Sequence, residues 1–321
     1  MRVVWWTEVG PPSVLRPGEA PDPVPGEGQV LVRVAVAAIT YIETQLRAGR
    51  SPRAGVSPPA VLGNGVGGTV VAVGPGVDPA LVGERVVTVT GGTGGYASLA
   101  LARSAELIQV HKKIGLETAT ALLADGRTAV GLHRLAAPKA GETVLVEAAG
   151  GGVGSLLVQL AAAAGARVVA AASSPSKLEL ARSLGAAETL DYTDPGWETR
   201  LKELAPDVVY DGVGGEIGRT ALDAIRPGGR FIVHGAASGV MTDTSGAVGV
   251  EVVGFAALQS IGQRARELSS AALDLAAEGK LRPTIGQTFP LERAADAHAA
   301  IEARQTLGKT LLVVEEQPGV I

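Results

Sequence analysis

A glycine-rich stretch at 147–161, "EAAGGGVGSLLVQLA", has the residue types and spacing that bind a phosphate group. Ala149, Gly151 and Gly154 stand at the three small-residue positions of a dinucleotide-binding fingerprint. The strand-like run "TVLVEAA" precedes them, and an apolar helical pattern begins near Val153. Small residues permit a tight turn, a close approach of the backbone to a pyrophosphate, and close packing of helix on strand. Because the chain holds 44 glycines, chance matches are common, but the flanks favour a dinucleotide cradle over a flexible turn.

The end of the next strand, "RVVAAAS", indicates which dinucleotide binds. An acidic residue there would bind the ribose 2′-hydroxyl of NAD. This chain instead has "SSPSK", with Ser173, Ser174 and Lys177. Hydroxyl groups and an ammonium group can hold a 2′-phosphate, so we predict NADPH as the cofactor. The alternative is that Ser173 only caps the following helix, for which the same residues are well suited.

The strands and helices that must position these residues follow two different sequence patterns, one in each part of the chain. Up to about residue 118, short strand-like runs such as "QVLVRVAVAAI" and "ERVVTVT" are separated by turn signals, which predicts a mostly antiparallel, partly barrel-like domain. From about Thr118, helical patterns alternate with short apolar strands. This alternation predicts an α/β domain with a doubly wound parallel Rossmann sheet of about six strands. The tail predicts one more helix between two strands.

Composition excludes several classes of protein. A net charge of −4 and a pI near 5.7 favour neither nucleic acid nor an anionic membrane as a partner. Without cysteine there is no disulfide, thiolate nucleophile or cysteine-ligated zinc, and four dispersed histidines favour no metal site. No signal peptide is apparent, and no apolar run reaches the roughly 20 residues of a spanning helix. We therefore expect a cytoplasmic globular protein of two domains.

Several stretches in the same order resemble the zinc-independent medium-chain dehydrogenase/reductases, specifically the NADPH:quinone oxidoreductase and zeta-crystallin group. The resemblance implies a GroES-like catalytic domain at 1–118 plus 284–321, a Rossmann domain at 119–283, and a homodimer that pairs edge strands. It also implies a small-molecule quinone or enone substrate. The matching stretches are "PPAVLGNGVGGTVVAVGPGV", "EAAGGGVGSLLVQLA", "SKLELARSLGA", "YDGVGG", "RPGGRFIVHGAASG" and "HAAIEARQTLGKTLLVV".

The resemblance also implies roles for individual residues. The pyrophosphate would contact Ala149, Gly151, Gly152, Val153 and Gly154. Lys177 and Tyr192 match positions at the 2′-phosphate and adenosine end, and Thr128 matches a threonine that faces the nicotinamide. The nicotinamide ribose would be lined by two strand ends, namely Val233, His234, Gly235 and Ala236, and then Gly254 and Phe255. Two alternatives stay open: Tyr192 as an ordinary half-buried aromatic, and Thr128 as a hydroxyl bonded to its own helix.

Two stretches depart from the pattern. Zinc-dependent relatives carry a Gly-His-Glu motif where this chain has "LGNGVGG" with Asn64, so we expect no catalytic zinc. Near the substrate, "TYIETQ" replaces the usual Asn by Thr40 and the usual Tyr by Gln45. If this segment is extended, Tyr41 points to the face opposite its neighbours and does not substitute for them.

Hydride transfer from NADPH to a quinone needs positioning, a dry pocket and stabilisation of a developing oxyanion. We expect backbone amides or a hydroxyl, such as that of Thr128 or Tyr41, to polarise the acceptor oxygen, while solvent supplies the proton. The main prediction is thus an NADPH-dependent quinone reductase. The alternatives are an enone or enal reductase, which uses the same hydride geometry, and a non-catalytic NADPH-binding sensor or scaffold, which the altered "TYIETQ" stretch suggests.

Overall fold

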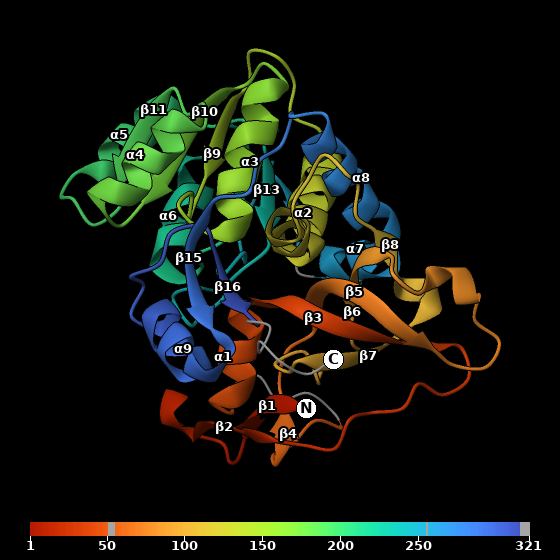
Figure 1. Ribbon diagram of the computed structural model, residues 1–321. Helices are drawn as coiled ribbons and strands as arrows, with labels where there is room; N and C mark the ends of the chain where they lie inside the picture. The colour runs from red at the N-terminus through yellow and green to blue at the C-terminus, as the bar shows by residue number, and fades with distance from the viewer. Residues whose placement is uncertain (51–54, 255, 315–321) are drawn as a thin grey trace. The chain divides into compact units, whose positions relative to one another are not determined.

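The computed structural model describes residues 1–50, 55–254 and 256–314. They form two compact units, each described here by itself (Figure 1). Unit 1 comprises Met1–Ala124, Leu273–Glu278 and Thr284–Ile321, and unit 2 comprises Asp125–Ala272 and Gly279–Pro283. Helix α2 (Leu116–Ala136) contributes residues to both units, so the domain limit expected at residues 118–119 falls inside this helix.

Unit 2 contains a six-stranded sheet in which every described pairing is parallel. Its strand order is β11-β10-β9-β12-β13-β14, so the order reverses between β9 and β12. This confirms the doubly wound parallel sheet predicted from the alternating pattern. The strands are β9 (Thr143–Val146), β10 (Arg167–Ala172), β11 (Glu188–Asp191), β12 (Val208–Asp211), β13 (Arg230–Val233) and β14 (Glu251–Val253).

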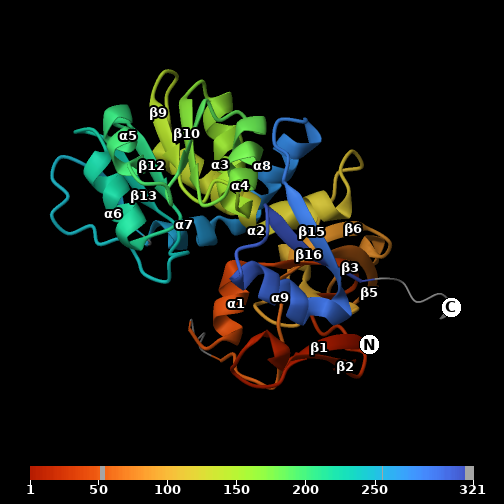
Figure 2. The same cartoon turned by 90° about the vertical axis from the view of Figure 1, so that its left-hand side faces the viewer.

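Helices cover both faces of this sheet, which is why its central strands are short and apolar. On one face lie α3 (Gly152–Ala163) and α4 (Pro175–Ser183), and on the other lie α5 (Trp197–Leu204) and α6 (Gly215–Ala224) (Figure 2). Alternate residues of the strands, such as Leu145 and Val209, pack against α5 and α6. The position of a residue along its strand therefore determines which layer of helices its side chain faces. The same rule determines the surroundings of a polar side chain at the end of a strand.

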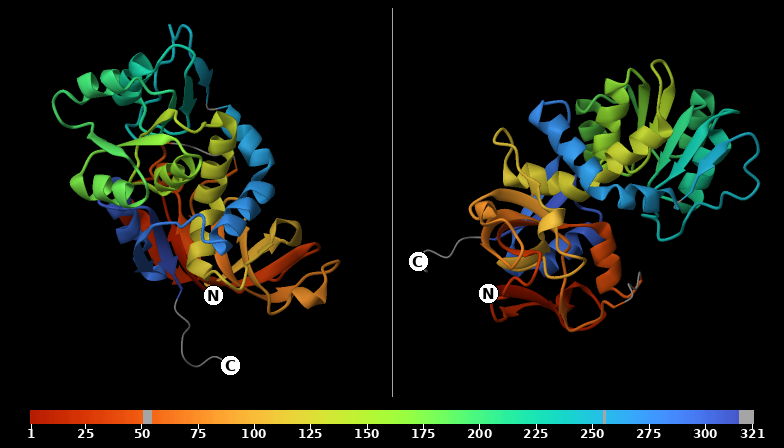
Figure 3. Two further views of the ribbon diagram at one scale, coloured as in Figure 1. Left: turned by 90° about the horizontal axis from the view of Figure 1, so that it is seen from above. Right: turned by 90° about the vertical axis from the view of Figure 1, so that its right-hand side faces the viewer.

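Two further helices follow the sheet, α7 (Ala257–Gln263) in unit 2 and α8 (Ala265–Ala277), whose residues from Leu273 on belong to unit 1. Figure 3 shows α8 in blue beside α2 in yellow, and a salt bridge of 2.9 Å joins Arg134 of α2 to Glu267 of α8. No helix among the described residues is long and apolar enough to cross a membrane.

Unit 1 is mostly antiparallel, as predicted. A seven-stranded sheet has the order β15-β16-β3-β5-β6-β8, with β7 also paired to β3, and a smaller sheet has the order β2-β1-β4. Only the pair β15–β16 is parallel among the described strand pairs of unit 1. The strands are β1 (Arg2–Trp6), β2 (Leu15–Glu19), β3 (Gln29–Ile39), β4 (Ala60–Val61), β5 (Gly65–Val73), β6 (Arg85–Val89), β7 (Leu99–Arg103), β8 (Ile108–Gln109), β15 (Ile285–Pro290) and β16 (Lys309–Val313).

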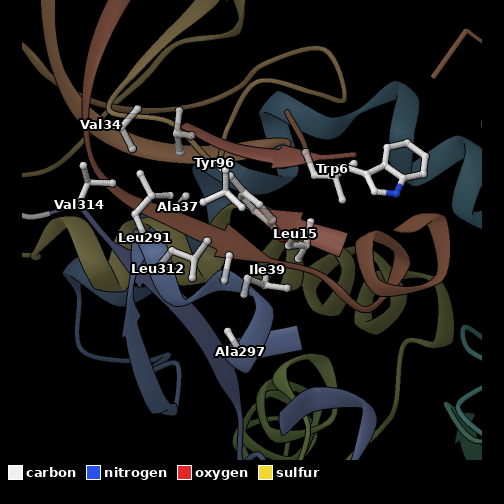
Figure 4. Packing of buried hydrophobic residues seen from close by; sticks show 14 of the residues in the cluster. Trp6, Leu15, Val34, Ala37, Ile39, Tyr96, Leu291, Ala297, Leu312 and Val314 are labelled. Atoms are coloured by element: carbon white, nitrogen blue, oxygen red, sulfur yellow. The ribbon is translucent and has the colours of Figure 1, made fainter. Parts of the chain in front are cut away.

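The core of unit 1 joins segments that are far apart in the chain. Trp6, Ile39, Tyr96 and Leu312 are at most 3% exposed and belong to one packed cluster (Figure 4). Two helices close this core, α1 (Tyr41–Arg47) and α9 (Ala294–Glu302). The C-terminal segment of the described chain thus completes the core of the N-terminal strands.

The segment "TYIETQ" is helical, so the expectation of an extended segment was wrong. Thr40 takes an extended conformation and Glu43 follows three residues later, which is the capping-box pattern of a helix start. The Glu43 carboxylate accepts a hydrogen bond of 2.6 Å from the Thr40 N–H. In a helix, residues four apart lie about one turn apart on the same face, so Tyr41 and Gln45 are close neighbours. The Tyr41 side chain is 46% exposed.

Candidate cofactor site and acceptor-side residues

The predicted cradle lies where β9 ends and α3 begins. Gly151 is the N-cap of α3, with φ −85° and ψ 174°. A Cβ on Gly152 would lie 2.0 Å from Oδ2 of Asp125, and one on Gly154 would lie 2.4 Å from the carbonyl oxygen of Ala148. Gly154 is therefore required by the backbone of the turn itself, whereas a side chain at position 152 would require the Asp125 side chain to move. A Cβ on Gly151 would meet only that same carbonyl, at 3.2 Å, so this glycine keeps space open beside the helix start.

The first turn of α3 is suited to hold an anion. Gly151 provides no side-chain cap, and the first N–H groups of a helix have no partner inside it. These amides, at Gly152, Val153 and Gly154, combine with the positive end of the helix dipole. Ala149 directly before them is fully buried and its N–H donates to the Ala171 carbonyl, which ties the turn to β10. The residues present thus fit a pyrophosphate.

Lys177 lies beside this turn. A Cβ on Gly150 would be 2.5 Å from Cγ of Lys177, so the alkyl stem of the lysine crosses the glycine loop. The structure therefore brings together two features that the sequence separates by more than twenty residues. The alternative role of Ser173 as a helix cap is wrong, because the N-cap of α4 is Ser174. Ser174 in turn makes no side-chain capping bond; its Oγ lies 3.3 Å from Oγ of Ser176.

Tyr192 and Thr128 have ordinary structural surroundings. Tyr192 follows β11, and its ring packs edge-on against Trp197 with centroids 6.3 Å apart. Its side chain is partly buried against the unit 2 core. Thr128 lies within α2 and is half-buried.

The predicted ribose-lining residues follow β13 and β14. Val233 belongs to the unit 2 core, so only its backbone is available to a ligand. A Cβ on Gly235 would lie 2.7 Å from the carbonyl oxygen of Gly212, so the loops after β12 and β13 touch there. Gly254 has open space around its α-carbon, and Phe255 lies outside the described residues.

His234 sits at the same strand ends. Its N–H donates to the Asp211 carbonyl at 2.9 Å, and a Cβ on Gly212 would lie 2.9 Å from Cε1 of the imidazole. Burial lowers the pKa of His234 to about 4, so the ring is neutral at neutral pH. Its Nε2 atom is buried and has no hydrogen-bond partner.

Two carboxyl groups that sequence reasoning missed lie at the ends of β9 and β12. Glu147 and Asp211 are both fully buried. Asp211 accepts hydrogen bonds from the N–H groups of Val213 (3.1 Å) and Gly214 (2.7 Å) and from the Thr242 hydroxyl. Neither oxygen of Glu147 has a hydrogen-bond partner, and burial together with the nearby Asp211 raises its pKa well above the ordinary value. In the sequence, each of these two carboxyl groups belongs to the single acidic residue that ends an apolar run, in "VLVEAA" and in "VVYDGV".

Unit 1 contains a second buried polar cluster, around Glu43. Its Oε1 accepts a hydrogen bond of 2.8 Å from the N–H of Asn64, and its Oε2 accepts one of 3.3 Å from the Tyr96 hydroxyl. The Tyr96 oxygen also lies 2.9 Å from Nε2 of His298. Burial raises the pKa of Glu43 and lowers that of His298 to about 3. The Glu43 carboxylate also binds the N–H of Thr40, so it holds Thr40 and Asn64 together, and both are positions at which the sequence departs from the patterns described above.

Among the described residues, no group of three or more His, Asp or Glu side chains could hold a metal ion. The side chain of Asn64, at the position of a zinc ligand in zinc-dependent relatives, has a buried Oδ1 without a hydrogen-bond partner.

Comparisons with known proteins agree with this geometry. Residues 26–112 match the family model described as alcohol dehydrogenase GroES-like domain, and residues 152–275 match the one described as zinc-binding dehydrogenase. A quinone oxidoreductase of Pseudomonas aeruginosa is 34% identical over 316 residues, which covers 95% of this chain and 97% of the relative. The chain belongs to the quinone oxidoreductase group of the medium-chain dehydrogenase/reductase family.

Other members of the medium-chain dehydrogenase/reductase family match over similar lengths. A 2-haloacrylate reductase of a Burkholderia species is 34% identical and covers 90% of this chain and 92% of the relative. The crystal structure of Escherichia coli quinone oxidoreductase complexed with NADPH superposes with a TM-score of 0.89 at 28% identity, covering 98% of this chain and all of that one. The GroES-like and Rossmann folds predicted from the sequence are thereby confirmed.

Proposed function

We propose that this protein is an NADPH-dependent oxidoreductase that transfers a hydride to a quinone. The observation that carries the proposal is the position of Lys177, whose alkyl stem crosses the glycine loop at Gly150. The segment after β10, which contains Lys177, has no acidic residue where an NAD-binding protein would have one. An ammonium group there supports binding of a 2′-phosphate, which distinguishes NADPH from NADH. The quinone oxidoreductase of Escherichia coli, complexed with NADPH, has the same fold over 98% of this chain.

In the proposed complex, the first-turn amides of α3 hold the pyrophosphate while Lys177, Ser173 and Ser174 hold the 2′-phosphate. When bound, NADPH supplies the hydride from its dihydronicotinamide ring. Tyr192 contacts the adenosine end, and the strand ends at Val233, His234 and Gly235 line the nicotinamide ribose. The roles of these residues rest on the family resemblance together with their positions at the carboxyl edge of the sheet.

On the acceptor side, we assign the polarising hydroxyls to Thr128 and Tyr41. Tyr41 begins α1 and exposes 46% of its surface, so its hydroxyl is accessible to a ligand. A hydroxyl that donates to the acceptor oxygen stabilises the charge that develops there as the hydride arrives. Solvent then supplies the proton. No metal enters the proposal, since the cysteine ligands of zinc-dependent relatives are missing from this sequence.

A second candidate is reduction of an activated carbon–carbon double bond. The 34% identity to a 2-haloacrylate reductase favours it, because a hydride delivered beside a carbonyl or carboxylate group serves both reactions.

The test is oxidation of NADPH and of NADH by the purified protein with 1,4-benzoquinone, a larger ortho-quinone, and 2-chloroacrylate. Turnover with NADPH and a quinone is expected. Turnover with the acrylate alone would replace the quinone by an alkene as the substrate class. Tight NADPH binding with no turnover on any acceptor would contradict both reactions and favour a cofactor-binding sensor.

The proposal extends to the organisation of the protein. It assigns catalysis to a split domain at 1–118 plus 284–321 and cofactor binding to 119–283, in a cytoplasmic homodimer. These assignments rest on the resemblance to the family. Sedimentation equilibrium of the purified protein tests the dimer.

A further inference from the structure

The pair Glu147 and Asp211 occupies a special place in the sheet of unit 2. The strand order reverses between β9 and β12, and ligands of doubly wound sheets bind beside such a reversal, at the carboxyl ends of the strands. Glu147 directly follows β9, and Asp211 ends β12. Because Val146 pairs with Tyr210, and the Glu147 N–H donates to the Tyr210 carbonyl at 3.1 Å, the next residues stand side by side.

Asp211 organises the turn that leads from β12 into α6. Its Oδ1 accepts from the N–H groups of Val213 and Gly214, and Gly214 is the N-cap of α6. Its Oδ2 accepts from the Thr242 hydroxyl. A carboxylate has about four acceptor positions, so these three donors leave room for one more. These three donors make Asp211 the hydrogen-bond acceptor of the pair.

Glu147 has much less of this support: the backbone donor that acts on it, the Val213 N–H, lowers its pKa less than burial and Asp211 raise it. Its side chain is fully buried, and neither of its oxygens has a hydrogen-bond partner. The charged group that acts on it is Asp211, of the same sign, and the neighbouring His234 is neutral. On α6, which packs against Asp211 at Gly218, the side chain of Glu216 is exposed and Arg219 pairs with Asp223. An uncompensated buried charge is among the costliest groups in a protein, so a second carboxylate there is strongly disfavoured.

We propose that Glu147 and Asp211 share one proton, and that this protonated pair is a positioning element that holds the 211–214 turn beneath the nicotinamide end of the cofactor. The proton lies on Glu147 and its O–H donates to the remaining acceptor position of Asp211. Loss of that proton places two carboxylates side by side and pushes the turn away from its position. The part of the proposal that concerns the cofactor rests on the proposed function; the shared proton does not.

The shared proton is tested on the cofactor-free protein with Glu147→Gln, which is neutral, has nearly the same shape, and can still donate to Asp211. In the wild type, folding keeps a proton on Glu147 that the unfolded chain releases above its ordinary pKa of about 4.3. The unfolding equilibrium constant of the wild type is therefore expected to rise with pH relative to that of the variant, by up to about tenfold per pH unit until Glu147 ionises in the fold. A ratio that does not change with pH would overturn the proposal.

Glu188→Gln is the matched control. Glu188 is also a strand residue of this sheet, but it pairs with Arg167 and Arg200, which lower its pKa. Its replacement is expected to leave the ratio constant above about pH 4.5 and to change it in the opposite direction only at lower pH, because Glu188 is already ionised in both the folded and the unfolded chain above its ordinary pKa. Infrared difference spectra give an independent readout: the C=O stretch of a protonated, buried carboxyl should be present in the wild type at neutral pH and absent in Glu147→Gln. Its absence from the wild type would also overturn the proposal.

The positioning role is tested by the dissociation constant of NADPH, measured by quenching of intrinsic fluorescence. Glu147→Ala removes the donor to Asp211 and is expected to weaken NADPH by about tenfold, the equivalent of one lost hydrogen bond to a charged group. Glu147→Gln should bind NADPH with most of the wild-type affinity. In the wild type, the affinity for NADPH should fall at alkaline pH as Glu147 loses its proton, and this fall should be absent in Glu147→Gln. Equal affinity in Glu147→Ala and wild type would overturn the positioning role. Failure of the wild type to bind NADPH would instead overturn the proposed function, while the titration of the cofactor-free protein would still stand.

Discussion

The carboxylate of Glu43 accepts a hydrogen bond of 2.8 Å from the backbone N–H of Asn64, which joins the start of α1 to the start of β5 inside unit 1. The same side chain binds the N–H of Thr40 and the hydroxyl of Tyr96. One buried carboxylate thus fixes two loops that the family resemblance places near the acceptor. Both loops carry the substitutions that set this chain apart from the family pattern, so their geometry bears on substrate range.

Replacing Glu43 by Ala should destabilise the protein by about 3 kcal/mol, because three donors lose their acceptor in a buried place. Urea unfolding followed by circular dichroism measures the change. Glu8→Ala is the matched control, since Glu8 is exposed, and it should change the free energy of unfolding by less than about 0.5 kcal/mol. Equal effects of the two substitutions would show that the Glu43 bonds contribute nothing to stability.

The buried His298 should make stability fall in mild acid. Burial, and secondarily the charge of Arg47, lower its folded pKa to about 3, below the value of about 6.5 in an unfolded chain. Its contribution is therefore complete above pH 6.5 and is lost as the pH falls through that value toward 3. At pH 5 the loss is about 2 kcal/mol.

His298→Gln, which cannot gain a charge, is expected to reduce this dependence when unfolding is measured between pH 7 and pH 4.5. Part of the pH dependence should remain in the variant, since burial also lowers the pKa of His234. An unchanged slope in the variant would mean that His298 has the same pKa in the folded and in the unfolded chain.

Reversing the charge at Lys177 should separate the two cofactors. Lys177→Glu is expected to weaken NADPH by about a hundredfold and NADH much less, because only NADPH carries the 2′-phosphate that we propose Lys177 binds. Lys202→Glu, on the exposed surface of α5 in the same unit, controls for net charge and should leave both affinities close to wild type. Isothermal titration with both cofactors provides the comparison, and an equal loss for the two would remove Lys177 from the 2′-phosphate.

The glycines of the cradle should fall into two kinds. Gly151→Val adds atoms on the open side of the turn and is expected to abolish NADPH binding, with only a small change in melting temperature. Gly154→Ala is expected to lower the melting temperature, because its Cβ would lie 2.4 Å from a backbone carbonyl of the same turn. Thermal unfolding and NADPH titration on both variants test this. Unaltered NADPH affinity in Gly151→Val would refute the cradle.

The sequence by itself determined the order of elements and the cradle, because both depend on local patterns. Alternating apolar strands and helices specify a parallel sheet, and Ala149, Gly151 and Gly154 meet requirements that are set within a few residues of one turn. Local reasoning failed at "TYIETQ", where the Thr40 and Glu43 pair is itself a helix-start signal and was overlooked in favour of an extended segment.

Only the tertiary structure decided which polar residues meet. Glu43, Tyr96 and His298 are separated by up to 255 positions, and nothing in their immediate neighbours indicates that they form one buried cluster. Glu147 and Asp211 are brought together by the pairing of β9 with β12, a register that no single strand specifies. The reason is physical: a buried carboxyl takes its charge state from the desolvation and the neighbours that the completed fold imposes, and these are not properties of the adjacent sequence.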